Sequence, residues 1–139
     1  MREIKFRAWT GDDMVDVSAI IFDEGTKVSP YEPHILDSHN DVHLLKDIEL
    51  MQYTGLRDKN GVEIYEGDVC SYGDITSDSF MLDNKKEVGQ VAFIKDKCAL
   101  MLQGIEGNHK LSFFWDWLED LEVIGNIHEN PELLESPDA

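Results

Sequence analysis

The chain has 139 residues, of which 42% are hydrophobic, and its formal net charge is −17 at pH 7. This length allows one domain or two small ones with a real core, and the composition is that of a globular protein rather than a disordered one. So large a negative charge disfavours binding to duplex DNA or to a membrane, and it favours a basic protein partner. The sequence is also compatible with a homo-oligomer.

The location and the redox state of the protein follow from short sequence features. Residues 19–22 and 98–102 are the longest apolar runs and are too short to span a bilayer, and nothing resembles a signal peptide. We therefore expect a cytoplasmic protein. Cys70 and Cys98 lie in strand-like apolar runs without a C-x-x-C spacing, so we expect two buried thiols rather than a disulfide.

The first part of the chain predicts strands joined by turns. Apolar and polar residues alternate over residues 4–9, a turn follows at residues 10–13, and a further strand is expected over residues 17–22. Residues 23–33 contain two prolines and a glycine and predict a loop.

A short helix or a turn is predicted over residues 39–45, ahead of a strand over residues 48–53. Ser38 is followed three residues later by Asp41, which resembles a capping box with Asp in place of the usual Glu. Such a box would open a helix at His39. The alternative for the same residues is a turn.

The stretch from residue 52 to 70, QYTGLRDKNGVEIYEGDVC, contains two strand-like runs on either side of a tight turn. Asn60 and Gly61 predict the turn, because Gly supplies the positive φ and Asn tolerates it. Asp58 is expected to accept hydrogen bonds in the same turn. Gly67 interrupts the second run and predicts a bulge or a bend.

The second half predicts short strands separated by turns, a pattern typical of a small barrel. The strands are expected at residues 69–72, 88–94, 98–103 and 123–127. Residues 73–87 are polar and predict a loop, and residues 111–121 have a helical spacing of Trp and Leu that predicts a helical turn. Asn130 and Pro131 stop the last strand, and another helical turn can begin there.

Three segments, in order, resemble the YopX family of small phage and prophage proteins. Residues 54–70 resemble its central motif, residues 2–9, REIKFRAW, resemble its opening, and residues 122–134, EVIGNIHENPELL, resemble its closing motif. The resemblance implies a mainly β fold, a β-rich α+β protein with some helix. It places an irregular N-terminal β region at residues 1–50 and an SH3-like small barrel at residues 51–139.

The resemblance implies no established activity, no catalytic residue and no cofactor, and it places the protein in the cytoplasm of the host cell. We expect the motif residues to be structural. They are Gly55, Asp58, Asn60, Gly61, Tyr65, Gly67, Asp68, Gly125, Asn126, Asn130 and Pro131.

Three histidines form the sharpest metal-like feature of the sequence. His39 and His43 are four residues apart, so on a helix both would face one side as zinc ligands can, with His34 or a carboxylate as a third ligand. The pattern lacks the adjacent glutamate of an HExxH motif, so we favour exposed loop histidines and expect no metal. A metal-dependent hydrolase is the least favoured function.

Two other groups invite a functional interpretation. Glu63, Glu66 and Asp68 crowd near a bend, where acidic side chains commonly accept hydrogen bonds from backbone amides, and this role is favoured over an acid–base pair. Trp115 and Trp117 belong to a dense aromatic group without interleaved Lys or Arg, which disfavours base stacking and makes them candidates for a protein interface.

No nucleophile elbow, Walker A or dinucleotide motif is present in the sequence. The sequence therefore favours a non-enzymatic protein-interaction module of phage or prophage type. The alternative is an acidic mimic of nucleic acid that binds a basic groove on a host or phage protein. A continuous negative stripe on the surface would favour mimicry, and scattered charge would favour the module.

Overall fold

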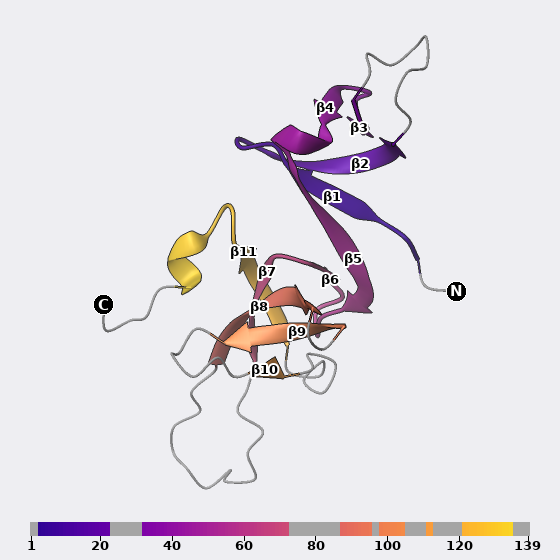
Figure 1. The fold of residues 1–139 in the computed structure, drawn as a ribbon. Coiled ribbons are helices and arrows are strands. Elements are labelled where there is room, and N and C mark those ends of the chain that lie inside the picture. Colours follow the sequence, from indigo (N-terminus) through magenta and orange to yellow (C-terminus); the bar gives the residue numbers. More distant parts are fainter. Residues whose placement is uncertain are drawn as a thin grey trace, which may run out of the picture. The chain divides into compact units, whose positions relative to one another are not determined.

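The computed structural model describes residues 3–22, 32–72, 87–95, 98–104, 111–112 and 121–134. These residues form antiparallel strands with short 3-10 helices, so the predicted mainly β fold is confirmed (Figure 1). The chain divides into two compact units, Met1–Tyr53 and Thr54–Ala139. No helix within the described ranges is both long and apolar enough to cross a membrane.

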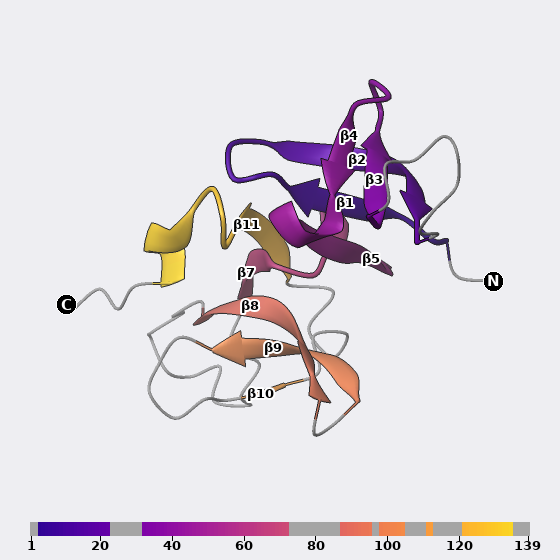
Figure 2. The ribbon, with the colours of Figure 1, turned by 45° about the horizontal axis from the view of Figure 1, so that its top comes forward.

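The first unit is built on an antiparallel sheet in the order β4-β3-β2-β1-β5 (Figure 2). Its strands are β1 (Phe6–Trp9), β2 (Met14–Ile21), β3 (His34–Asp37), β4 (Val42–Leu44) and β5 (Glu49–Arg57), with the 3-10 helix η1 (Leu45–Asp47) between the last two. The predicted turn between β1 and β2 is present, because the Thr10 amide donates to the Asp13 carbonyl at 3.0 Å. The C-terminal end of β5 continues into the second unit.

Of the two alternatives predicted for residues 39–45, the short helix is wrong and the turn is confirmed, because this part of the chain forms the turn and the second strand of a β3–β4 hairpin. Asp37 is the residue that reverses the chain. Its Oδ1 accepts hydrogen bonds from the His39 amide at 2.8 Å and from the Asp41 amide at 3.0 Å. Asn40 adopts a left-handed conformation at φ 66°, which closes the turn instead of continuing a helix.

The second unit contains β6 (Glu63–Tyr65), which pairs with β5, and a five-stranded antiparallel sheet in the order β10-β9-β8-β7-β11. The strands of this sheet are β7 (Asp68–Tyr72), β8 (Glu87–Ile94), β9 (Ala99–Gly104), β10 (Leu111–Ser112) and β11 (Glu122–Asn126). The hairpin of β8 and β9 and the helical turn η4 (Pro131–Leu134) confirm two expectations. In the described ranges β10 and β11 do not pair, so the sheet is open.

A buried apolar cluster fills the second unit. Its members are Ile64, Cys70, Val91, Leu102 and Leu121. Burial, with some help from the neighbouring Asp68 and Asp58 carboxylates, raises the pKa of the Cys70 thiol far above its ordinary value.

The two cysteines are both free, but only Cys70 is buried. The expectation of a buried Cys98 is wrong. Cys98 lies in the turn between β8 and β9, where its amide donates to the Lys95 carbonyl at 3.1 Å and its φ is 49°. A turn position exposes the side chain even though the residues that follow Cys98 are apolar.

Candidate functional site

Asp58 joins the central motif to the closing motif. Its Oδ1 accepts hydrogen bonds from the Asn60 amide at 2.8 Å and the Val62 amide at 2.9 Å, and its Oδ2 accepts one from the Val123 amide at 2.9 Å. Gly61 completes the turn with the positive φ of 82° expected of it. The carboxylate therefore fixes a turn and attaches the start of β11 to it.

The electrostatics of Asp58 fit this structural role. The residue is only 6% exposed, and burial by itself opposes ionisation. The amides of Val123, Val62 and Asn60 outweigh burial, so the pKa of Asp58 lies below its ordinary value of 3.8. A buried carboxylate whose oxygens are occupied by backbone amides is poorly suited to proton transfer.

Gly67 and Asp68 form a second junction between the same motifs. The Gly67 amide donates to the Val91 carbonyl at 2.8 Å, and its carbonyl accepts from the Ile127 amide at 2.9 Å. Asp68 is 2% exposed, and its Oδ2 accepts the Tyr65 amide at 2.7 Å. The glycine therefore lies in a turn between β6 and β7 rather than in a bulge within one strand.

The closing motif folds into a turn held by two asparagines. Asn126 Oδ1 accepts the amides of His128 at 3.0 Å and Glu129 at 2.8 Å. Asn130 Oδ1 accepts the Asn126 amide at 3.3 Å and approaches Gly125 so closely that a Cβ there would lie 2.5 Å from it. Only glycine fits that position, and η4 then begins at the next residue.

The remaining motif residues, and the other residues singled out in the sequence, are placed as follows. Gly55 lies within β5 at φ 87°, and Pro131 is the first residue of η4. Glu63 has Arg57 as an ionic neighbour at 3.9 Å, and Glu66 precedes Gly67 in the β6–β7 turn. Trp115 and Trp117 lie outside the described residues. The motif residues therefore make contacts that determine the fold. A candidate binding surface lies in other parts of the protein.

The three candidate histidines do not converge, and the expectation of exposed loop histidines is wrong for His34, which is buried in β3, and for His43, which is half-buried in β4. His43 pairs with Ile35 across the β3–β4 hairpin, so its side chain lies on the opposite sheet face from that of His34. The His34 Nδ1 hydrogen bonds to the Glu32 carbonyl at 3.0 Å, and His39 is exposed in the turn. Within the ranges that the structure describes, no three His, Cys, Asp or Glu side chains are placed to hold a metal ion.

His43 instead contacts the buried carboxylate of Asp37. The Nε2 atom of His43 lies 2.9 Å from Oδ2 of Asp37, whose side chain is 4% exposed. This hydrogen bond, followed by the amide of Asp41, lowers the pKa of Asp37 below its ordinary value of 3.8 against the opposing effect of burial. The pair secures the β3–β4 hairpin.

Strand β4 forms one edge of its sheet. In an antiparallel pair, directly opposed residues alternate between those that exchange backbone hydrogen bonds and those that do not. The Asp37 amide donates to the Asp41 carbonyl, and the Leu45 amide donates to the Pro33 carbonyl, both at 3.0 Å. By this alternation, the N–H and C=O groups of the β4 residues Val42 and Leu44 point away from β3.

The surface at this edge is partly apolar. Val42 is 54% exposed, and Leu44 is partly exposed on the same face of the strand. We call these two residues, with their outward backbone groups, the β4 edge.

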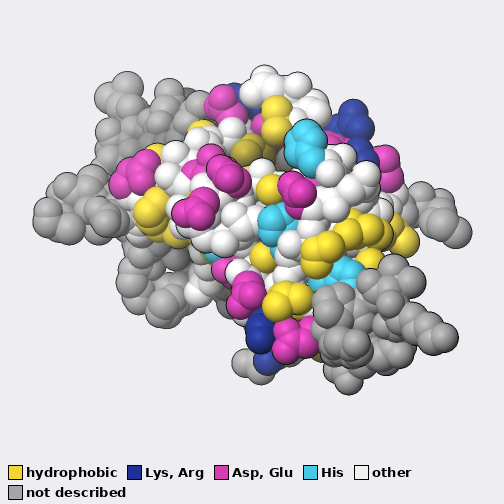
Figure 3. Space-filling model, turned by 90° about the horizontal axis from the view of Figure 1, so that it is seen from above, with side chains coloured by type: hydrophobic (Ala, Val, Ile, Leu, Met, Phe, Trp, Pro, Cys, Tyr) yellow, Lys and Arg dark blue, Asp and Glu magenta, His cyan; other side chains and the backbone are white. Residues whose placement is uncertain are grey.

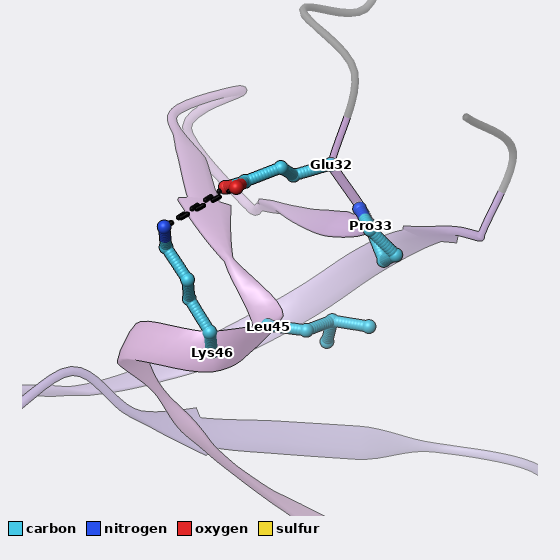
Figure 4. A pocket seen from close by; sticks show the side chains of 4 residues that line it. All are labelled: Glu32, Pro33, Leu45 and Lys46. Carbon is cyan, nitrogen blue, oxygen red and sulfur yellow. Dashed lines mark hydrogen bonds and ion pairs between the residues drawn. The ribbon is translucent and has the colours of Figure 1, made fainter. Parts of the chain in front are cut away.

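A hollow of about 370 Å³ lies at the end of the β4 edge and is lined by Glu32, Pro33, Leu45 and Lys46. Glu32 and Lys46 form an ion pair at 3.2 Å across it. Figure 4 shows Pro33 and Leu45 on the same side of this ion pair, so the hollow has an apolar part and a charged rim.

The segment that carries this edge is acidic. Residues 32–47 contain four acids, Glu32, Asp37, Asp41 and Asp47, and one base, Lys46, which gives −4 + 1 = −3 with neutral histidines. On the face in Figure 3, acidic side chains are interspersed with hydrophobic and histidine side chains. The edge therefore combines backbone donors and acceptors, apolar surface and negative charge.

The sequence reasoning did not identify the β4 edge. The alternation of Val42, His43 and Leu44 is a strand signal, but it is only three residues long. Strand order, which places these residues at an edge, depends on pairing with distant segments and cannot be read from local spacing.

Comparisons with known proteins agree with this description. A family model described as YopX protein matches residues 5–135. The crystal structure of protein EF1440 from Enterococcus faecalis is similar, with 27% sequence identity and a TM-score of 0.58, over 97% of this chain and 100% of that one. No curated protein matches the chain.

Proposed function

The chain belongs to the YopX protein family, and from this premise we propose that it is a non-enzymatic protein-interaction module of phage or prophage type. The proposed binding surface is the β4 edge with the adjoining hollow. The partner is a protein with a basic contact surface, met in the cytoplasm of the host cell.

The use of the motif side chains supports this proposal. The carboxylates of Asp58 and Asp68 and the amide oxygens of Asn126 and Asn130 accept backbone N–H groups. The residues that carry the family resemblance therefore specify a scaffold. A scaffold with fixed strands and an exposed edge is a common basis for protein binding.

The strand order of the second unit also fits a small barrel. Its last strand, β11, lies beside β7, and β7 to β10 follow one another as a meander. We propose that this sheet curls into an SH3-like barrel, in which β10 would approach β11. A barrel would hide the two edges of this sheet and leave the β4 edge of the other sheet as a binding edge.

Nucleic-acid mimicry is the competing function. A mimic presents its charge as one continuous stripe, whereas the acidic side chains in Figure 3 are separated by hydrophobic and histidine side chains. An edge with Val42 more than half exposed is suited to a protein partner.

Site-specific photocrosslinking tests the proposed function. A benzoylphenylalanine is placed at Val42, and in a matched control at Val62, which is 46% exposed in the second unit. In host cells we expect one adduct of defined mass from position 42, reduced by excess unlabelled protein, and none from position 62. Failure of both positions to give any saturable adduct would contradict the interaction module.

A further inference from the structure

We propose that the partner binds by adding an extended, basic strand to the β4 edge. This inference rests on the proposed function and names the chemistry of the partner. It comes from three properties of the same few residues: the direction of their backbone groups, their exposed apolar side chains and the charge around them.

The backbone of β4 is prepared for one more strand. Residues 41, 43 and 45 direct their amides and carbonyls to β3, as the bonds from Asp37 and Leu45 show, so those of Val42 and Leu44 point outward. Two residues of this kind offer two donors and two acceptors at the spacing of an antiparallel or parallel ladder. Binding by strand addition draws its affinity from such main-chain groups.

The side chains around the edge restrict which strand fits. Val42 and Leu44 share one face, so the added strand needs an apolar side chain on that face. The ladder ends at the hollow lined by Pro33 and Leu45, which can take a further apolar group. Alternating apolar residues therefore match this edge.

Charge decides the rest of the partner's chemistry. Segment 32–47 has a net charge of −3 and the whole chain has −17, so lysine or arginine on the added strand gains attraction from both. A second copy of this chain would bring an identical acidic segment to the edge, with like charges facing each other. The charge balance therefore favours a basic partner over self-association.

The experiment uses the full chain, labelled with nitrogen-15, and a heptapeptide of alternating valine and lysine with blocked ends. Its affinity is measured by NMR titration at low salt, where the attraction is strongest. We expect saturable shifts at the amides of Val42 and Leu44 and no binding of the same peptide with glutamate in place of lysine. Shifts confined to other parts of the chain would overturn the proposal.

Val42→Pro tests the role of the backbone. Proline removes the outward amide, which makes no bond to β3, whereas Val42→Thr keeps that amide and a similar side-chain shape. Loss of one hydrogen bond should weaken binding of the peptide about three- to tenfold in Val42→Pro relative to Val42→Thr. Equal affinity in two folded variants would overturn strand addition.

Two further probes keep the test decisive if Val42→Pro does not fold. A version of the peptide with every backbone nitrogen methylated keeps its lysine charges, but its main chain cannot donate hydrogen bonds, and it should not bind the unaltered protein. Asp41→Asn removes a charge beside the edge and should weaken binding about two- to fivefold, while Glu132→Gln, an equal change on the second unit, should not. Binding of the methylated peptide, or equal effects of the two charge changes, would overturn the proposal.

The two proposals fail in different ways. A saturable crosslink at position 42, together with equal affinity of folded Val42→Pro and Val42→Thr for the peptide, would leave the interaction module standing and reject strand addition. Absence of any crosslink, with the peptide still bound at the edge, would reject the function and keep the chemistry of the edge.

Discussion

Asp58 joins two distant parts of the chain. Its carboxylate accepts the amides of Asn60 and Val62 in its own turn and the amide of Val123, which is 65 residues away. We predict that Asp58→Ala destabilises the protein by about 2–4 kcal/mol, since it leaves the amides of Asn60, Val62 and Val123 without their partly buried acceptor. The exposed Asp12→Ala, the control, should change the free energy of unfolding by less than about 0.5 kcal/mol. Chemical denaturation measures both, and equal effects would contradict the role given to Asp58.

Asp37 makes the stability of the first unit depend on pH. Its pKa is lowered in the folded protein by His43, Asp41 and His39, so its contribution is present above the unfolded value of 3.8 and is lost as pH falls below it. We predict that the difference in unfolding free energy between the unaltered protein and Asp37→Asn is constant above about pH 5 and shrinks below 3.8.

Urea denaturation from pH 6 to 2.5 follows this difference. His43→Ala serves as the matched variant, because it removes the largest cause of the lowered pKa and should reduce the dependence on pH. A difference between the protein and Asp37→Asn that stays the same throughout would show that the ionised Asp37 carboxylate does not stabilise the hairpin.

At the scale of elements, β11 and η4 complete the second unit, and Val123 of β11 packs against its buried cluster. Strand β11 pairs with β7, and Leu133 of η4 lies against Gly125. We predict that a chain ending at Glu122 is aggregated or unfolded, because it lacks most of β11 and the amide bonded to Asp58. A chain ending at Leu134 should melt as the full protein does.

Circular dichroism and size-exclusion chromatography of the two truncated chains provide the measurement. The chain ending at Leu134 is the control for the loss of residues as such. A soluble fragment ending at Glu122 with a cooperative melting transition would contradict the structural role of the closing motif.

The elements that the sequence predicted are those fixed by local chemistry. Asn60 and Gly61 specify their turn by backbone preference alone, and the β8–β9 hairpin follows from alternation on both sides of a short connection. The sequence did not predict the β3–β4 hairpin, because the capping role was assigned to Ser38 instead of to Asp37, one residue earlier. Ser38 and Asp41 look like a helix cap, but Asp37 is the acceptor, and with Asn40 it forms a turn.

The candidate site was less predictable than the fold. The edge position of Val42 and the bond from Asp58 to Val123 depend on contacts between segments that are distant in the chain. The histidine pattern was read on a helix, whereas strand geometry separates His34 from His43. Local spacing alone cannot decide whether this segment is a helix or a strand, because that depends on which strands pair.

At the scale of the whole molecule, the charge of −17 governs what can approach. We predict no binding to duplex DNA at about 50 mM salt, because counterion release needs several Lys or Arg at phosphates and no basic residue follows Lys110. Fluorescence anisotropy with a labelled duplex tests this, with a basic DNA-binding protein as the positive control. Micromolar binding that weakens steeply with salt would contradict the prediction.

The central claim is that the motifs build the scaffold while the β4 edge binds the partner. Amide hydrogen exchange of the full chain, with and without the partner identified by crosslinking at position 42, tests both halves at once. The account predicts that Val62 and Val123 are protected in both states, whereas Val42 and Leu44 gain protection only with the partner. Exchange that slows at the motif turns and stays unchanged at Val42 and Leu44 would contradict it.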